Sequence, residues 1–112
     1  MDQRALYTNL GDKNLDALVS ESFNTPVALV FTADWLGSSH IMDTFMEELA
    51  QDYQEDMHFY RQDIDDDKTL SAAIGINQLP TTVIFQNGEI IDYFAGVISK
   101  EKIREKILSA IS

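Results

Sequence analysis

Ser39 and His40 are the side chains of this sequence best suited to nucleophilic chemistry. A serine attacks only when a nearby base removes its proton, and His40 follows Ser39 directly. The segment is typical of the start of a helix, where successive side chains point about 100° apart. Serine is also a leading residue type at helix N-termini. We therefore expect Ser38 or Ser39 to cap a helix, His40 to lie on the surface, and no residue here to be catalytic.

The acidic run at positions 63–67 raises the question of a calcium site. Asp63, Asp65 and Asp67 match the first half of an EF-hand loop, which continues with a glycine at its sixth position and a bidentate glutamate at its twelfth. Those two positions hold Lys68 and Ile74. We therefore predict no metal site and expect Asp66 or Asp67 to cap the helix that follows.

Charge restricts the partners that this chain can have. Its 112 residues include 8 basic and 19 acidic ones, for a formal net charge of −11. A nucleic acid or an anionic membrane needs a basic face, and no apolar run approaches the ~20 residues that span a bilayer. We expect neither kind of partner, whereas a basic protein is permitted. Acidic surfaces also keep proteins soluble, which favours a monomer.

Length and the N-terminal residues bear on domain organisation and location. A chain of this length predicts a single domain over residues 1–112, large enough for one core without disulfides or metal. The segment from Met1 to Arg4 does not lead into an apolar stretch as a signal peptide would. We therefore expect a cytoplasmic protein.

The segment Trp35-Leu36-Gly37-Ser38-Ser39 resembles the active site of the thioredoxin family, W-C-G-P-C, with both cysteines replaced. Leu36 stands at the position of the nucleophilic cysteine and Ser39 at that of the resolving one. The chain has no cysteine at all. Disulfide exchange requires a thiolate, so the reaction that the resemblance implies is unavailable, and we expect no oxidoreductase activity.

Three further motifs fall in the thioredoxin order: an apolar strand at 27–31, Leu79-Pro80-Thr81-Thr82, and the hairpin turn Asn87-Gly88, followed by Gly96. The resemblance covers nearly the whole chain, from about residue 6. It implies an α/β thioredoxin fold with a mixed central sheet of four to five strands, helices on both faces, and a cis Leu79–Pro80 peptide bond. In the family a buried aspartate precedes the active site; Val30 holds that place here, and Arg61 matches the basic residue that pairs with it.

Hydrophobic spacing predicts elements in the order β-α-β-α-β-α-β-β-α. We expect strands at 5–8, 27–32, 57–64, 81–85 and 90–94. Helices are expected at 14–23, 38–53 and 68–74, with a last one capped by Ser99. The buried helix faces are predicted to be Leu15, Leu18, Val19 and Phe23; Ile41, Phe45, Leu49 and Tyr53, widened by Met42 and Met46; and Ile103, Ile107, Leu108 and Ile111.

The resemblance implies a surface that receives an extended peptide, made of Trp35, Leu36, Gly37, Ser38, Leu79, Pro80, Gly96 and Val97. Our first hypothesis is a redox-inactive module that binds a peptide or protein there without a cofactor, in a chaperone-like role. One version is similar to the cysteine-less thioredoxin-like proteins of hydrogenase maturation, which bind basic signal peptides. The alternatives are an enzyme of altered, for example glutathione-dependent, chemistry and an acidic cation-binding domain.

Overall fold

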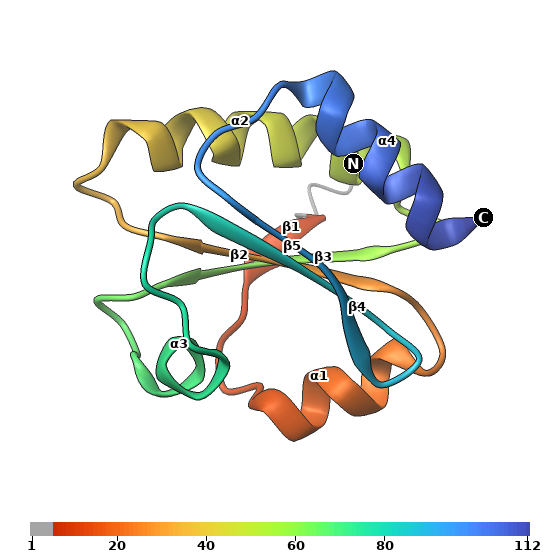
Figure 1. The fold of residues 1–112 in the computed structure, drawn as a ribbon, viewed down its shortest axis with the longest axis horizontal. Coiled ribbons are helices and arrows are strands. Elements are labelled where there is room, and N and C mark those ends of the chain that lie inside the picture. Colours follow the sequence, from red (N-terminus) through yellow and green to blue (C-terminus); the bar gives the residue numbers. More distant parts are fainter. Residues whose placement is uncertain (1–5) are drawn as a thin grey trace, which may run out of the picture.

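Five strands form one mixed sheet in the order β1-β3-β2-β4-β5 in the computed structural model, which describes residues 6–112. β3 runs parallel to β1 and β2, whereas β4 is antiparallel to both β2 and β5. Helices α2 and α4 cover one face of the sheet, and α1 and α3 cover the other (Figure 1). The elements are β1 Tyr7–Asn9, α1 Leu15–Ser22, β2 Val27–Thr32, α2 Gly37–Asp52, β3 His58–Asp63, α3 Thr69–Ile74, β4 Thr81–Gln86, β5 Glu89–Ala95 and α4 Lys100–Ile111.

This element order confirms the sequence-based prediction, and the mixed sheet with helices on both faces confirms the fold class. The first strand is an edge strand as expected, but it covers Tyr7–Asn9 and not 5–8. Ala5, where we expected it to begin, lies outside the described residues. Ser99 accepts a hydrogen bond from the Lys102 N–H and caps α4 as predicted.

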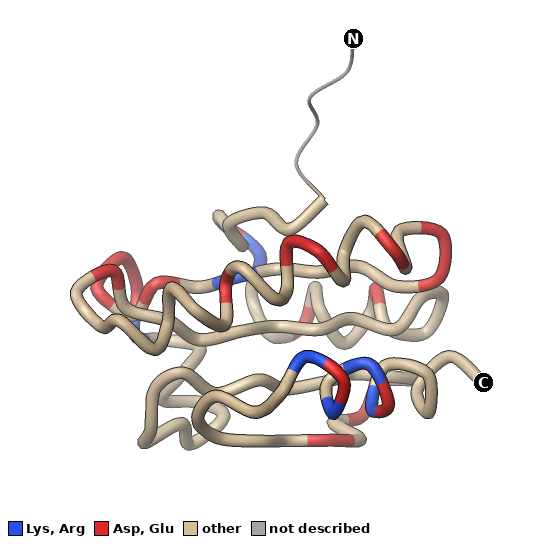
Figure 2. The backbone as a smooth tube through the Cα atoms, turned by 90° about the horizontal axis from the view of Figure 1, so that it is seen from above, with Lys and Arg blue, Asp and Glu red and all other residues tan. Residues whose placement is uncertain are grey.

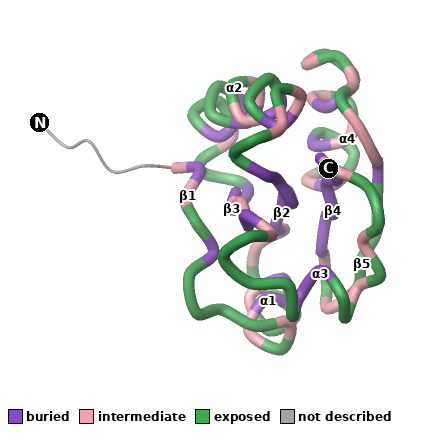
Figure 3. Tube along the Cα trace, turned by 90° about the vertical axis from the view of Figure 1, so that its left-hand side faces the viewer, coloured by how far each residue is buried: buried purple, intermediate pink, exposed green. Residues whose placement is uncertain are grey.

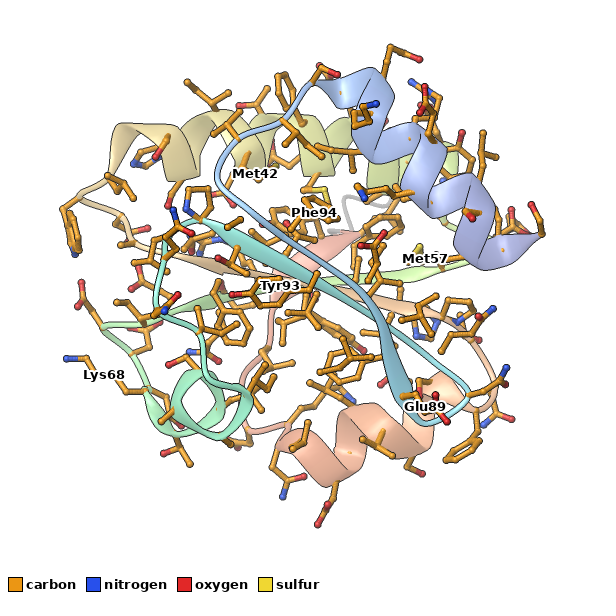
Figure 4. All side chains as sticks on the ribbon, viewed as in Figure 1. Met42, Met57, Lys68, Glu89, Tyr93 and Phe94 are labelled. Atoms are coloured by element: carbon orange, nitrogen blue, oxygen red, sulfur yellow. The ribbon has the colours of Figure 1, made fainter. Side chains whose placement is uncertain are left out.

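The central strand β2 is buried along its whole length, as a strand covered on both faces must be. Its alternate side chains therefore belong to two cores. Val30 packs in the core beneath α2 and α4, and Phe31 packs in the core on the side of α1 and α3. Figure 4 places Met42 and Phe94 in the first of these layers, and Figure 3 shows buried β2 and β4 within a rim of exposed loops.

Three residues that we expected to be buried are exposed: Phe23, Ile41 and Leu108. In α2 the buried positions are Met42, Met46, Leu49 and Ala50, so the face is rotated away from the stripe that begins at Ile41. In α4 the face is completed by Ala110 in place of Leu108. The apolar stripe of each helix is wider than the strip that the sheet can cover, and the residue at its margin stays in water.

The longest helix described is α2, with 16 residues. Across residues 6–112 none combines the length and the apolar character that a bilayer crossing requires.

Candidate functional site

The sheet register brings three separate segments to one edge. Phe31 pairs with Thr81, and Thr81 pairs with Ala95. The loop after β2, the segment before β4 and the residues after β5 therefore meet at this edge. The Gly96 N–H donates to the Pro80 carbonyl at 2.7 Å, and the Leu79–Pro80 bond is cis, as predicted.

An open groove of about 650 Å³ lies beside this edge. Trp35 and Leu36 come from the loop after β2, Leu79 from the segment before β4, and Ile64 and Ile76 from the residues on either side of α3. Trp35 is 67% exposed, and Leu36 and Leu79 are half-buried. We call this feature the groove; its main lining residues are Trp35, Leu36, Ile64, Lys68, Ile76 and Leu79.

The groove unites only part of the surface predicted from the sequence. Gly37 and Ser38 lie in the first turn of α2, next to Leu36. Pro80 is buried, and Gly96 and Val97 lie just past β5; none of the three lines the groove. Sequence reasoning missed Ile64, Ile76 and Lys68. Ile64 and Ile76 lie on either side of a helix of six residues, and only the packing of that helix places them in the groove. Lys68 is the N-cap of the same helix, and its side chain points away from the body of the molecule (Figure 4).

The expectation that Ser38 or Ser39 caps α2 is wrong. The helix starts at Gly37, so Leu36 is the N-cap and it offers no side-chain acceptor. Ser39 is only 1% exposed, and its Oγ accepts a hydrogen bond from the Ala33 N–H at 3.1 Å. This serine closes the turn between β2 and α2, where the second cysteine of a thioredoxin would lie.

His40 is exposed, as predicted. Its Nε2 lies 2.6 Å from the Asp34 carbonyl oxygen, to which the ring N–H donates. The Ser39 hydroxyl is engaged by the Ala33 N–H. The two neighbours therefore face different partners and do not form a nucleophile–base pair.

The acidic loop between β3 and α3 holds the Trp35 loop. The Trp35 indole N–H donates to Asp65 Oδ2 at 2.9 Å, and the Asp34 backbone N–H donates to Asp63 Oδ2 at 3.3 Å. Asp67 Oδ1 accepts from the Thr69 N–H, which lowers the pKa of this carboxyl group and supports the start of α3. The prediction that Asp66 or Asp67 is the helix cap is wrong, because Lys68 is the N-cap residue and makes no side-chain cap hydrogen bond.

Arg61 contacts the Trp35 loop through Asp34. Its guanidinium contacts Asp43 and Asp34, each at 3.3 Å, and Tyr7 Oη donates to Asp43 at 2.6 Å. Burial raises the pKa of the Tyr7 phenol, and the Asp43 charge adds to that effect. Burial alone would lower the pKa of Arg61, but the charge of Asp43, the nearby Tyr7 and the hydrogen bonds to Asp43 and Asp34 together outweigh it, and the pKa is raised.

Val30 lies where thioredoxins carry their buried aspartate, and it is fully buried. It pairs with Arg61 on one side and with Thr82 on the other. Within residues 6–112, the Thr82 hydroxyl is the only fully buried side-chain polar atom without a hydrogen-bond partner. The Thr82 hydroxyl is therefore a buried polar group beside Val30, on the neighbouring strand β4.

The acidic residues do not form a metal centre in this geometry. Across residues 6–112 no three histidine or acidic side chains come together as metal ligands would. Both Asp63 oxygens already accept backbone N–H groups, from Asp34 and Asp65. The loop is organised around backbone donors.

The family model for thioredoxin matches residues 7–109. The chain belongs to the thioredoxin family. A thioredoxin of Mycoplasmoides gallisepticum is 35% identical over 91 residues, covering 81% of this chain and 88% of that protein. A mutant thioredoxin from Halobacterium salinarum is 28% identical with a TM-score of 0.81, over 95% and 90% of the two chains. The Malassezia sympodialis thioredoxin has a TM-score of 0.83 at 22% identity, over 100% of this chain and 96% of that one.

This member of the thioredoxin family has leucine and serine in place of the two reactive cysteines and no cysteine elsewhere. The frame around them is kept: the Trp35 loop, the cis Leu79–Pro80 bond and the Gly96 contact with Pro80. The two positions that hold the reactive cysteines in the family hold Leu36, which lines the apolar groove, and Ser39, which is buried.

Proposed function

We propose that this protein is a redox-inactive member of the thioredoxin family that binds an extended segment of a partner protein in the groove, as a chaperone would. The observation that carries this proposal is the apolar character of the groove at the position of the lost thiol, where Leu36 lies beside an exposed Trp35. Aromatic and aliphatic side chains in such hollows are the usual anchors of protein interfaces.

The backbone beside Pro80 supports an extended partner. Among residues 6–112 neither the N–H nor the C=O of Leu79 has a backbone partner, although β4 begins two residues later. An unpaired N–H and C=O next to an apolar hollow can bind a strand by main-chain hydrogen bonds, with the hollow taking one of its side chains. This mode of binding needs no cysteine.

The absence of thiol chemistry follows from the residues at the two cysteine positions. Leu36 has no ionisable atom, and the Ser39 hydroxyl is buried and engaged by the Ala33 N–H. A serine hydroxyl is not ionised near neutral pH and has no base beside it here. We therefore propose that the protein does not catalyse disulfide exchange.

Affinity capture with a matched pair of variants tests the binding surface. Leu36→Asp places a charge in the groove, and Leu108→Asp makes the same change at an exposed leucine on α4. Partners captured from native cell extract by the wild type and by Leu108→Asp should be lost with Leu36→Asp. For a purified partner the affinity should fall at least about tenfold. If Leu36→Asp is folded and retains every partner, the binding surface lies elsewhere.

A further inference from the structure

The turn between β4 and β5 contains Asn87-Gly88, the only asparagine–glycine step in the sequence. In such a step the backbone nitrogen of the glycine can attack the asparagine side chain, because glycine has no Cβ to hinder the approach. Gln86 pairs with Glu89 across the turn, and Asn87 and Gly88 have φ values of 53° and 83°. Two positive φ values are typical of the type I′ turn that joins hairpin strands. Asn87 is exposed, so its side-chain amide is open to water.

The reaction available to this step is deamidation. The Gly88 nitrogen gives up its proton and forms a bond to Cγ of Asn87, and the side-chain nitrogen leaves as ammonia, which carries that proton away. Water then opens the cyclic imide at one of its two carbonyl carbons. The product is either aspartate or isoaspartate, in which the main chain runs through the side chain and is longer by one carbon. The first bond forms only if the Gly88 nitrogen is free to reach Cγ.

In the folded protein the end of α1 engages both backbone N–H groups of the turn, which lies beside it (Figure 1). The Gly88 N–H donates to the Ser22 hydroxyl oxygen, and the Asn87 N–H donates to the Ser22 carbonyl oxygen, each at 2.9 Å. Ser22 is buried, and its hydroxyl donates in turn to the Val19 carbonyl at 2.7 Å. Loss of the Gly88 proton would break the bond to this fixed hydroxyl, so the contact opposes the first step of deamidation.

Phe23 holds the same peptide unit from outside. A Cβ added to Gly88 would lie 2.3 Å from Cζ of the ring, so the ring packs directly against the glycine Cα. Closing the imide requires the Gly88 nitrogen to turn toward Cγ of Asn87, which rotates this peptide unit out of the type I′ geometry. The ring and the two Ser22 contacts oppose that rotation. The reaction therefore requires the turn to separate from α1 first.

We infer that Asn87 is a latent deamidation site, which the end of α1 blocks in the folded protein. The site becomes reactive when the hairpin separates from Ser22 and Phe23. An isoaspartate at this position would then keep the hairpin from closing again, because it lengthens the main chain of a two-residue turn. The turn lies at the opposite end of β4 from the groove, so the inference does not rest on the proposed function.

Incubation of the protein in mildly alkaline buffer, followed by peptide mass spectrometry, tests the inference. Deamidation adds a negative charge to an acidic chain whose basic positions lie mostly on α4 (Figure 2), so anion exchange also separates the product. The variants are Ser22→Ala and Phe23→Ala. The matched control is Ser71→Ala: Ser71 is also buried and its hydroxyl also donates to the carbonyl three residues before it, that of Lys68, but it lies in α3.

The wild type unfolded in urea should deamidate at Asn87 before any other asparagine, at least about tenfold faster than the folded protein. Folded Ser22→Ala should react about fivefold faster than the Ser71→Ala control, the effect of one lost hydrogen bond. Phe23→Ala should also react faster than the control. Circular dichroism shows which variants are folded, and if Ser22→Ala is not, the exposed position Phe23 decides. Equal rates for the folded and the unfolded wild type, or for the folded α1 variants and the control, would overturn the inference.

Discussion

Trp35 is held by Asp65 although the two residues are thirty positions apart: the indole N–H donates to Asp65 Oδ2 at 2.9 Å. The bond joins the loop that precedes α2 to the acidic loop that precedes α3. It fixes the edge of the groove while the ring itself stays exposed. The position of this aromatic side chain thus depends on a carboxylate that no local motif assigns to it.

Asp65→Ala should free Trp35, whereas Asp65→Asn should hold it, because an amide oxygen also accepts a hydrogen bond. Trp35 is the only tryptophan in the chain, so its fluorescence reports on this loop alone. Acrylamide quenching should increase and fluorescence anisotropy should fall for Asp65→Ala, with Asp65→Asn close to the wild type. Equal quenching of all three proteins would show that the bond does not restrain the ring.

Leu36→Asp should be more stable than Leu36→Ala. Leu36 is the N-cap of α2 and has no side-chain acceptor, and both variants lose the same leucine packing. Aspartate can accept from the N–H groups of the first turn and places a negative charge at the helix N-terminus. Chemical denaturation should show a difference of about 1 kcal/mol in the free energy of unfolding. A lower stability for the aspartate variant would contradict this account of the helix start.

Thr82→Val should stabilise the fold, because it replaces the unpaired buried hydroxyl with a methyl group of the same shape. We expect a gain of about 1 kcal/mol and a rise in Tm of about 4 °C. Thr81→Val is the matched control: the Thr81 hydroxyl donates to the Gln78 carbonyl at 2.7 Å, so its loss should destabilise the protein. A fall in Tm for Thr82→Val would mean that its hydroxyl has a buried partner.

Leu36→Cys with Ser39→Cys should form a disulfide, because residues three apart at the start of a helix are neighbours. The wild type should show no turnover in an insulin-reduction assay, and the double variant should show only weak activity, since Val30 cannot carry a proton. Adding Val30→Asp should raise the rate and lower the stability, because a carboxylate is costly to bury. Wild-type turnover above the uncatalysed background would contradict the absence of redox chemistry.

The sequence predicted the element order and the family because both depend on local signals: the apolar run of β2, the Asn87-Gly88 turn and the Trp35 loop. It misplaced Leu108 and Ile41 because periodicity finds an apolar stripe but not how much of it the sheet covers. It also misjudged Ser39, since a start of α2 at Gly37 turns that hydroxyl toward Ala33.

The lining of the groove could be predicted only in part. Trp35, Leu36 and Leu79 belong to motifs, whereas Ile64 and Ile76 reach the groove through the placement of a short helix. The contacts of Arg61 with Asp43 and Asp34 and of Trp35 with Asp65 join distant segments. Such contacts depend on tertiary packing, and no local pattern in a single sequence predicts them.

Amide exchange at Leu79 tests the central claim most directly. In the free protein its N–H has no backbone partner within residues 6–112, so it should exchange faster than the Val83 and Ile84 amides of β4. A peptide that the wild type selects from a phage-displayed library of random ten-residue peptides, added to saturation, should slow exchange at Leu79. It should also shift the Trp35 indole N–H signal in ¹H–¹⁵N spectra. Slowed exchange at Leu79 is the result that strand addition in the groove predicts. Unchanged exchange at Leu79, with shifts confined to other faces of the molecule, would contradict it.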